Sequence, residues 1–146
     1  YVELLKKTYV VFSLSAFSRN LRKEITKSTK IYFWDLGIRN ALIQNHNPLM
    51  LRNDAGSLWE NYCISERLKM CFHHQKNANY YFWRTYDQQE IDLIEEVKGQ
   101  LNAFECKLNA KTKVNAPKVF LESYPGSHYT VVTQETASAF LLPSAR

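Results

Sequence analysis

The chain has 146 residues, of which 45% are hydrophobic and 23% charged, and this is enough for one domain with a hydrophobic core, or for one domain and part of another. No apolar run approaches the roughly 20 residues of a membrane-spanning helix, and the first residues do not resemble a secretory signal peptide. Three cysteines are too few, and odd in number, for a disulfide framework, so we expect reduced thiols in a cytoplasmic protein.

The net charge of +5 resides in the first 30 residues, where seven basic side chains accompany two acidic ones. The remaining residues are balanced. A concentrated basic segment is the expected footprint of a phosphate-binding surface. We therefore expect five side chains to contact nucleic-acid phosphates: Arg19, Arg22, Lys23, Lys27 and Lys30. A solvated tail that keeps the chain in solution is an equally good interpretation of the charge alone.

Hydrophobic periodicity and turn residues predict an α/β protein. The expected elements in chain order are a helix over 2–8, a strand over 10–17, a basic loop over 18–30, a strand over 31–34, helices over 35–44 and 57–72, strands over 80–86, 90–95 and 101–108, a helix over 116–124, a strand over 129–133 and a helix over 136–142. Asp35 is a plausible N-cap of its helix, and Pro117 stands where the first turn of a helix tolerates proline.

The order of these elements predicts two parts. A helix followed by a strand, a basic loop and a strand is typical of a winged helix, so we expect residues 1–44 to be a partial winged-helix segment with its wing at 18–30. Residues 45–56 are then a linker. Residues 57–146 form an α/β domain whose order is α-β-β-β-α-β.

The second and third strands of that domain carry the most informative residues. If Lys98 and Gly99 form a two-residue turn, Asp92 lies directly opposite Glu105, and Lys107 shares their face of the sheet. Two opposed carboxylates normally destabilise a sheet, and a divalent cation between them removes that cost. A lysine beside them favours chemistry at a phosphate, because an ammonium stabilises developing negative charge.

Two alternative interpretations remain open at this stage. The same register places Glu90 opposite Lys107, so the charged residues could form an ordinary solvent face. The opposite, buried face would then consist of Ile91, Leu93, Phe104, Cys106 and Leu108. On the first helix of the domain, Glu60 follows Ser57 at the spacing of a capping box, a role that needs no metal.

The aspartate followed by Glu-x-Lys on the next strand resembles the PD-(D/E)XK nuclease superfamily, whose core has the α-β-β-β-α-β order. The resemblance implies that Asp92 and Glu105 bind Mg²⁺ (or Mn²⁺), helped by the backbone carbonyl between the glutamate and the lysine. It implies that Lys107 orients the attacking water and that Glu60 completes the site. The chain departs from the pattern in having Ile91 where a proline often precedes the aspartate.

Most of the chain also resembles the C-terminal half of a bacterial or archaeal AAA-type ATPase with an uncharacterised C-terminal domain. The stretches that carry this resemblance lie at 1–12, 18–23, 30–37, 56–61 and 81–94. It implies that an ATPase module in the same polypeptide precedes a winged helix and a nuclease-like domain. The sequence holds no Gly-x-x-x-x-Gly-Lys-Ser/Thr loop, so we expect ATP to bind outside these residues.

The first hypothesis for function is a nuclease-like domain that binds DNA and hydrolyses phosphodiesters with Mg²⁺. The second is a domain of this fold that binds nucleic acid without cleaving it. The third is a regulatory or assembly module of the parent ATPase.

Overall fold

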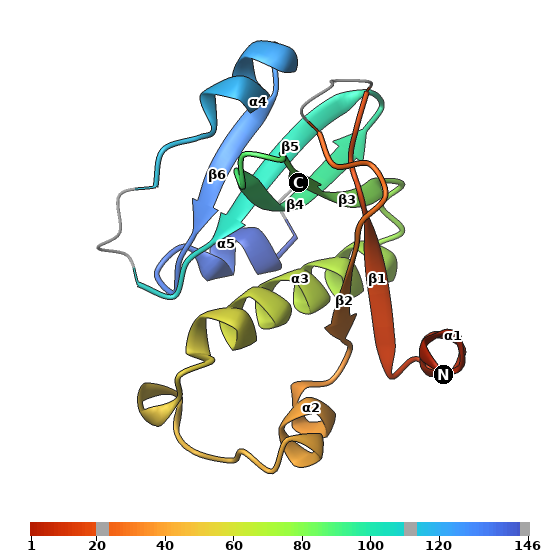
Figure 1. The fold of residues 1–146 in the computed structure, drawn as a ribbon, viewed down its shortest axis with the longest axis vertical. Helices are drawn as coiled ribbons and strands as arrows, with labels where there is room; N and C mark the ends of the chain where they lie inside the picture. Colours follow the sequence, from red (N-terminus) through yellow and green to blue (C-terminus); the bar gives the residue numbers. More distant parts are fainter. Residues whose placement is uncertain (20–23, 110–113, 144–146) are drawn as a thin grey trace.

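The computed structural model of the chain describes residues 1–19, 24–109 and 114–143. Its elements (Figure 1) are α1 (Val2–Lys7), β1 (Val11–Ala16), β2 (Thr29–Phe33), α2 (Leu36–Leu42), the 3-10 helix η1 (Leu49–Leu51), α3 (Ala55–His73), β3 (Asn79–Arg84), β4 (Glu90–Val97), β5 (Gln100–Cys106), α4 (Lys118–Ser123), β6 (His128–Val132) and α5 (Ala137–Leu141). The helices and strands follow the expected order, and η1 is a short addition within the expected loop.

All six strands belong to one mixed sheet in the order β2-β1-β3-β4-β5-β6. The pairs β1–β3 and β5–β6 are parallel, and the other neighbours are antiparallel. The chain is therefore a mixed α/β protein. Because β1 and β2 extend the sheet that β3 to β6 form, the sheet crosses the predicted boundary at residues 45–56.

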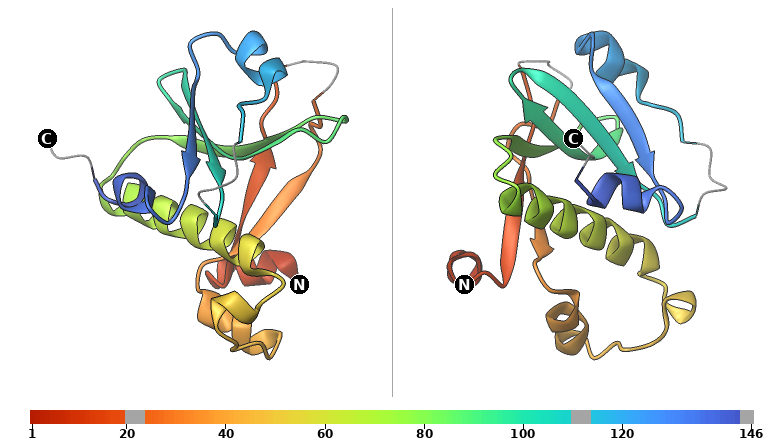
Figure 2. Two further views of the ribbon diagram at one scale, coloured as in Figure 1. Left: turned by 90° about the vertical axis from the view of Figure 1, so that its left-hand side faces the viewer. Right: turned by 180° about the vertical axis from the view of Figure 1, so that it is seen from behind.

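Hydrophobic side chains pack against both faces of the sheet. On one face α3 and α5 contribute Ile64, Leu68 and Phe140 to a core, and on the other α4 contributes Phe120, which packs on Trp83. Figure 2 shows α3 and α5 next to each other, with α4 well apart from them. Full burial of each such side chain stabilises the fold by about 1.5–3 kcal/mol. Among the described residues, no helix is both long and apolar enough to cross a membrane.

The β4–β5 hairpin has the predicted turn and register. Lys98 and Gly99 both have positive φ angles, of 50° and 83°. Two positive φ angles are what a type I′ two-residue turn requires, and glycine adopts this conformation without steric cost. Leu93 stands opposite Phe104, and the pairing continues without slippage to the turn. The turn therefore sets which side chains meet at the far end of the hairpin.

A bulge interrupts β4 where it pairs with β3. Tyr81 opposes Ile94 but Trp83 opposes Ile91, so β4 has one more residue than β3 over this stretch. The sequence predicts Ile91 and Leu93 on one face, and this is wrong. Ile91 packs with Trp83 on the α4 face, whereas Leu93 packs on the α3 face, because a bulge breaks the alternation of side chains along a strand. The bulge lies in the part of β4 that carries Asp92.

Strand β2 lies at the edge of the sheet and is held to α3 by a side chain. The amide oxygen of Asn61 accepts a hydrogen bond from the backbone N–H of Phe33 at 2.9 Å, and its amide nitrogen donates to the carbonyl of Phe33 at 2.7 Å. Asn61 is buried. Buried backbone groups need partners, so this pairing fixes the position of β2 relative to α3.

We expect Asn61→Ala to lower the free energy of unfolding by about 1–3 kcal/mol, because the N–H and C=O of Phe33 lose their partner. Urea denaturation measures the change as a lower midpoint with an unchanged m-value. The control is Asn77→Ala in an exposed loop, for which the change should stay within about 0.5 kcal/mol. Equal stability of the two variants would contradict the proposed role of Asn61.

Candidate active site

The three residues of the Asp and Glu-x-Lys pattern lie near the end of the hairpin opposite its turn, within electrostatic range of one another and of Glu60 on α3. Asp92 on β4 and Glu105 on β5 are only 6% and 8% exposed. The Lys107 ammonium lies 2.7 Å from Glu105 Oε1, whereas Glu105 Oε2 is buried and has no hydrogen-bond partner among the residues that the structure describes. Glu60 projects from α3 toward the same place, and its charge acts on Asp92.

Asp92 ties the two strands together and has a strongly perturbed acidity. Its Oδ2 accepts a hydrogen bond from the backbone N–H of Cys106 at 2.8 Å. Burial raises the pKa of Asp92 to about 7, with further contributions from the negative charges of Glu60 and Glu105. The N–H of Cys106 and the ammonium of Lys30 act in the opposite direction. Asp92 therefore exchanges its proton close to neutral pH.

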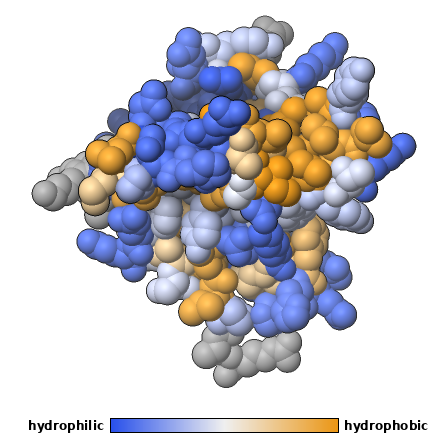
Figure 3. Space-filling view, turned by 90° about the horizontal axis from the view of Figure 1, so that it is seen from below, coloured by the Kyte–Doolittle hydropathy of each residue, from blue (hydrophilic) through white to orange (hydrophobic). Residues whose placement is uncertain are grey.

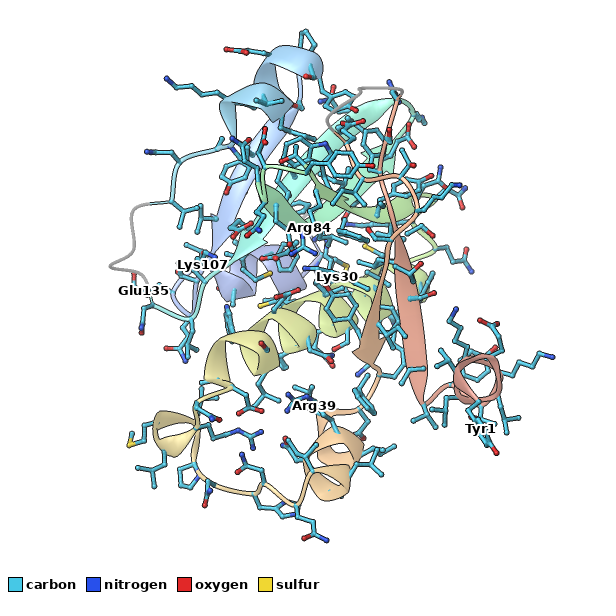
Figure 4. The ribbon with its side chains drawn as sticks, viewed as in Figure 1. Tyr1, Lys30, Arg39, Arg84, Lys107 and Glu135 are labelled. Carbon is cyan, nitrogen blue, oxygen red and sulfur yellow. The ribbon has the colours of Figure 1, made fainter. Side chains whose placement is uncertain are left out.

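Lys30, on β2, lies among the carboxylates. Its Nζ is 3.0 Å from Glu60 Oε1 and 3.6 Å from Asp92 Oδ1, and it also pairs with Glu90 Oε1. Burial by itself lowers the pKa of Lys30, but the charges of Glu60, Glu90 and Asp92 outweigh that effect and hold the pKa above its usual value. Figure 4 shows Lys30 and Arg84 close together above α3. The sequence predicts Lys30 as a phosphate contact, and in the structure carboxylates surround it.

Glu60 does not cap its helix. The N-cap of α3 is Asp54, so Ser57 lies inside the helix and the capping-box interpretation is wrong. Glu60 Oε1 accepts hydrogen bonds from the hydroxyl of Tyr32 at 2.7 Å and from Lys30. Glu60 therefore joins α3 to the edge strand β2.

The interpretation of these residues as a charged solvent face is also wrong, because the two opposed carboxylates are buried. Glu90 was the expected surface partner of Lys107. It pairs instead with Lys30 and, at 3.1 Å between Oε2 and Nε, with Arg84. We call Glu60, Glu90, Asp92 and Glu105 the carboxylate cluster.

The other predicted phosphate contacts do not gather at this cluster. Arg19 lies on the loop after β1, and its guanidinium is 2.7 Å from Glu96 Oε1. Lys27 is exposed on the same loop. Arg22 and Lys23 lie outside the described residues. Among the described residues of the basic segment, Lys30 is the one with ion pairs to the cluster.

Whether the cluster fits a divalent cation can be tested on its donor atoms. Within the described ranges, no three His, Cys, Asp or Glu side chains are placed to hold one metal ion together. The donors themselves are of the kind that Mg²⁺ prefers, namely carboxylate oxygens. A buried carboxylate oxygen without a partner, Glu105 Oε2, is an acceptor that a cation would satisfy. Asp92 and Glu105 therefore supply donor atoms of the type that Mg²⁺ prefers, although no third carboxylate of the described residues is placed to join them around one ion.

Comparison with known proteins places this site in a family. A profile described as Domain of unknown function (DUF4143) matches residues 55–142, which is more than half of the chain. The chain belongs to the DUF4143 family. Members of this family often form the C-terminal part of AAA-type ATPases. A second profile, Domain of unknown function (DUF8612), matches residues 1–49.

Two curated relatives extend the similarity beyond the DUF4143 profile. They are uncharacterised proteins of Mycobacterium tuberculosis and Mycobacterium bovis, each 28% identical over 117 residues. The match covers 79% of this chain and 26% of each relative, so the chain spans about a quarter of the length of these proteins. No solved structure gives a significant match. The three residues of the Asp and Glu-x-Lys pattern and Glu60 fall within the DUF4143 match.

The sequence did not indicate that Tyr32, Lys30 and Arg84 belong to the cluster. Each comes from a strand whose contact with the cluster depends on pairing between distant segments. Lys30 comes directly before the predicted strand over 31–34, and because β2 begins earlier, at Thr29, Lys30 alternates with Tyr32 and shares its face. Such a lysine on an inward face needs a buried acidic partner.

We expect the stability of the protein to fall as the pH rises from about 4 to about 7, by on the order of 4 kcal/mol from Asp92 alone. The pKa of Asp92 is higher in the folded than in the unfolded chain, so the folded state binds the proton more tightly and loses this contribution above pH 7. Asp92→Asn keeps an acceptor for Cys106 and should remove that dependence.

Urea denaturation of the wild type and Asp92→Asn at pH 5 and pH 8 measures this effect. Asp92→Asn should gain stability relative to the wild type as the pH rises. Asp87→Asn, in an exposed loop, serves as the matched control and should follow the wild type. Parallel pH curves for all three proteins would show that Asp92 is not perturbed by its neighbours.

Proposed function

We propose that the carboxylate cluster with Lys107 is a nuclease-type site that hydrolyses phosphodiesters of nucleic acid, with DNA as the first candidate substrate. The observation that carries the proposal is the burial of Asp92 and Glu105 near the end of the hairpin opposite its turn, with one oxygen of Glu105 that has no partner among the described residues. The order α3-β3-β4-β5-α4-β6 supports a PD-(D/E)XK-like core. In the proposed winged-helix segment, α1 would be the helix and β1 and β2 the strands.

Asp92 and Glu105 would hold Mg²⁺, which when bound polarises a phosphate oxygen and lowers the pKa of a water. Lys107 lies beside Glu105 and is placed to orient that water or to face the phosphate. The charge of Glu60 acts on Asp92, and Glu60 would add negative charge from α3 to the site. Lys27 and Arg19 lie on the basic loop, where they would contact the backbone of the nucleic acid.

A second candidate function is supported by one specific observation. Lys30 already balances Glu60, Glu90 and Asp92, so the cluster can exist as a set of ion pairs without a metal. In that case the domain binds nucleic acid, or regulates an attached ATPase module, without cleaving. The two functions differ in whether Asp92 is needed for a chemical step.

The test is the conversion of supercoiled plasmid to nicked and linear forms with Mg²⁺ or Mn²⁺. We expect cleavage by the wild type that is lost in EDTA and reduced to the level of a protein-free control by Asp92→Asn, because one of two metal ligands is weakened. Asp87→Asn is the matched control and should cleave as the wild type does.

Equal nicking by the wild type and Asp92→Asn would point to a contaminant and contradict the proposal. Absence of nicking by either, together with a DNA mobility shift that weakens steeply with salt, would favour the non-cleaving function. The affinity of Asp92→Asn and of Asp87→Asn for DNA should fall with salt alike, because neither Asp92 nor Asp87 lies on the basic loop.

A further inference from the structure

We propose that Lys30 is a built-in counter-ion of the carboxylate cluster. Its ammonium holds the cluster together while no divalent cation is bound, and it leaves the cluster when one binds. This inference rests on the proposed function, since it assumes that the cluster takes a divalent cation. It adds a step to metal binding: the divalent cation enters the cluster as the ammonium of Lys30 leaves it.

The position of the ammonium is the first support. Lys30 Nζ contacts carboxylates from two different elements, Glu60 of α3 and both Glu90 and Asp92 of β4. A carboxylate oxygen that pairs with the ammonium has part of its charge neutralised, so it attracts a second cation less strongly. The ammonium therefore competes directly with a metal ion for the cluster.

The balance of charge is the second support. Four carboxylates meet three cations there, of which Arg84 serves Glu90 and Lys107 serves Glu105. Lys30 is left to neutralise the charge around Asp92 and Glu60. A divalent ion at Asp92 and Glu105 would supply that charge in its place, and two cations at such short range repel each other. The negative charge that now holds the ammonium of Lys30 would then be neutralised by the divalent ion, so Lys30 would be displaced.

The third support is that the ammonium of Lys30 can reach solvent. It belongs to β2, the edge strand, and its side chain is 23% exposed, so the ammonium has a path to solvent. The pairing of Asn61 with Phe33 and the β1–β2 ladder hold the backbone of β2 in place. The flexible stem of a lysine can swing without disturbing either. A released Lys30 could bind a phosphate of the substrate.

Binding of Mn²⁺ to the wild type and to Lys30→Met tests this directly by calorimetry and thermal unfolding. Without metal, Lys30→Met should melt at a lower temperature than the wild type, because carboxylates lose their counter-ion. With saturating Mn²⁺ the difference should close, and the Kd for Mn²⁺ should be tighter by about tenfold or more. The control is Lys69→Met, which removes an exposed pair with Glu66 on α3 and should not change the Kd.

A measurement on the wild type alone keeps the test independent of the stability of the variant. Acetylation of lysines by a water-soluble ester, followed by mass spectrometry, reports how free each amine is. Modification of Lys30 should rise severalfold when Mn²⁺ is added, while that of Lys69 should stay constant.

The outcomes separate the two proposals. Mn²⁺ binding with equal Kd in the wild type and Lys30→Met, and unchanged acetylation of Lys30, would overturn the counter-ion role and leave the metal site intact. No Mn²⁺ binding to the wild type or to Lys30→Met would overturn the metal site and the exchange together. Tighter binding by Lys30→Met, with the rise in acetylation, supports both.

Discussion

Asp92 and Glu105 are withdrawn from water at the ends of two paired strands, and their charge has to be balanced where they lie. Moving an ionised carboxylate out of water costs several kcal/mol unless a cation or hydrogen bonds compensate. The compensating groups come from separate parts of the chain: Lys107 beyond β5, Lys30 on β2 and the N–H of Cys106. The placement of β2 and α3 against the hairpin is therefore coupled to the charge of this one site.

The rest of the fold makes that site rigid in its backbone and adjustable in its side chains. The hairpin turn sets the register, and the bulge in β4 occurs beside Asp92. Asn61 fixes the edge strand, so that only the side chain of Lys30 has to move for the cluster to change its cation. Figure 3 shows, from below, a broad hydrophobic area on the side where α1 and α2 lie in Figure 1. Both helices carry exposed apolar residues.

Local signals in the sequence predicted the elements and the register, because turn and periodicity act over a few residues. The turn at Lys98 and Gly99 was enough to predict the pairing of β4 with β5 as far as Leu93 and Phe104. The bulge and the role of Lys30 could not be predicted, because both depend on contacts between segments far apart in the chain. The parallel pairing of β1 with β3 has the same origin, and it places β1 and β2 in the sheet of the predicted α/β domain. Glu60 was ambiguous in sequence for a different reason: a capping box and an inward-facing carboxylate have the same spacing until the start of the helix is known.

The most direct measurement is a crystal structure of the protein soaked in Mn²⁺, with anomalous scattering recorded for manganese. A bound ion should give a peak between Asp92 and Glu105, about 2.0–2.3 Å from a carboxylate oxygen of each, with the ammonium of Lys30 turned away from Glu60 and Asp92. An absence of the peak, with Lys30 still paired to both carboxylates, would contradict the metal site and leave the cluster as a set of structural ion pairs.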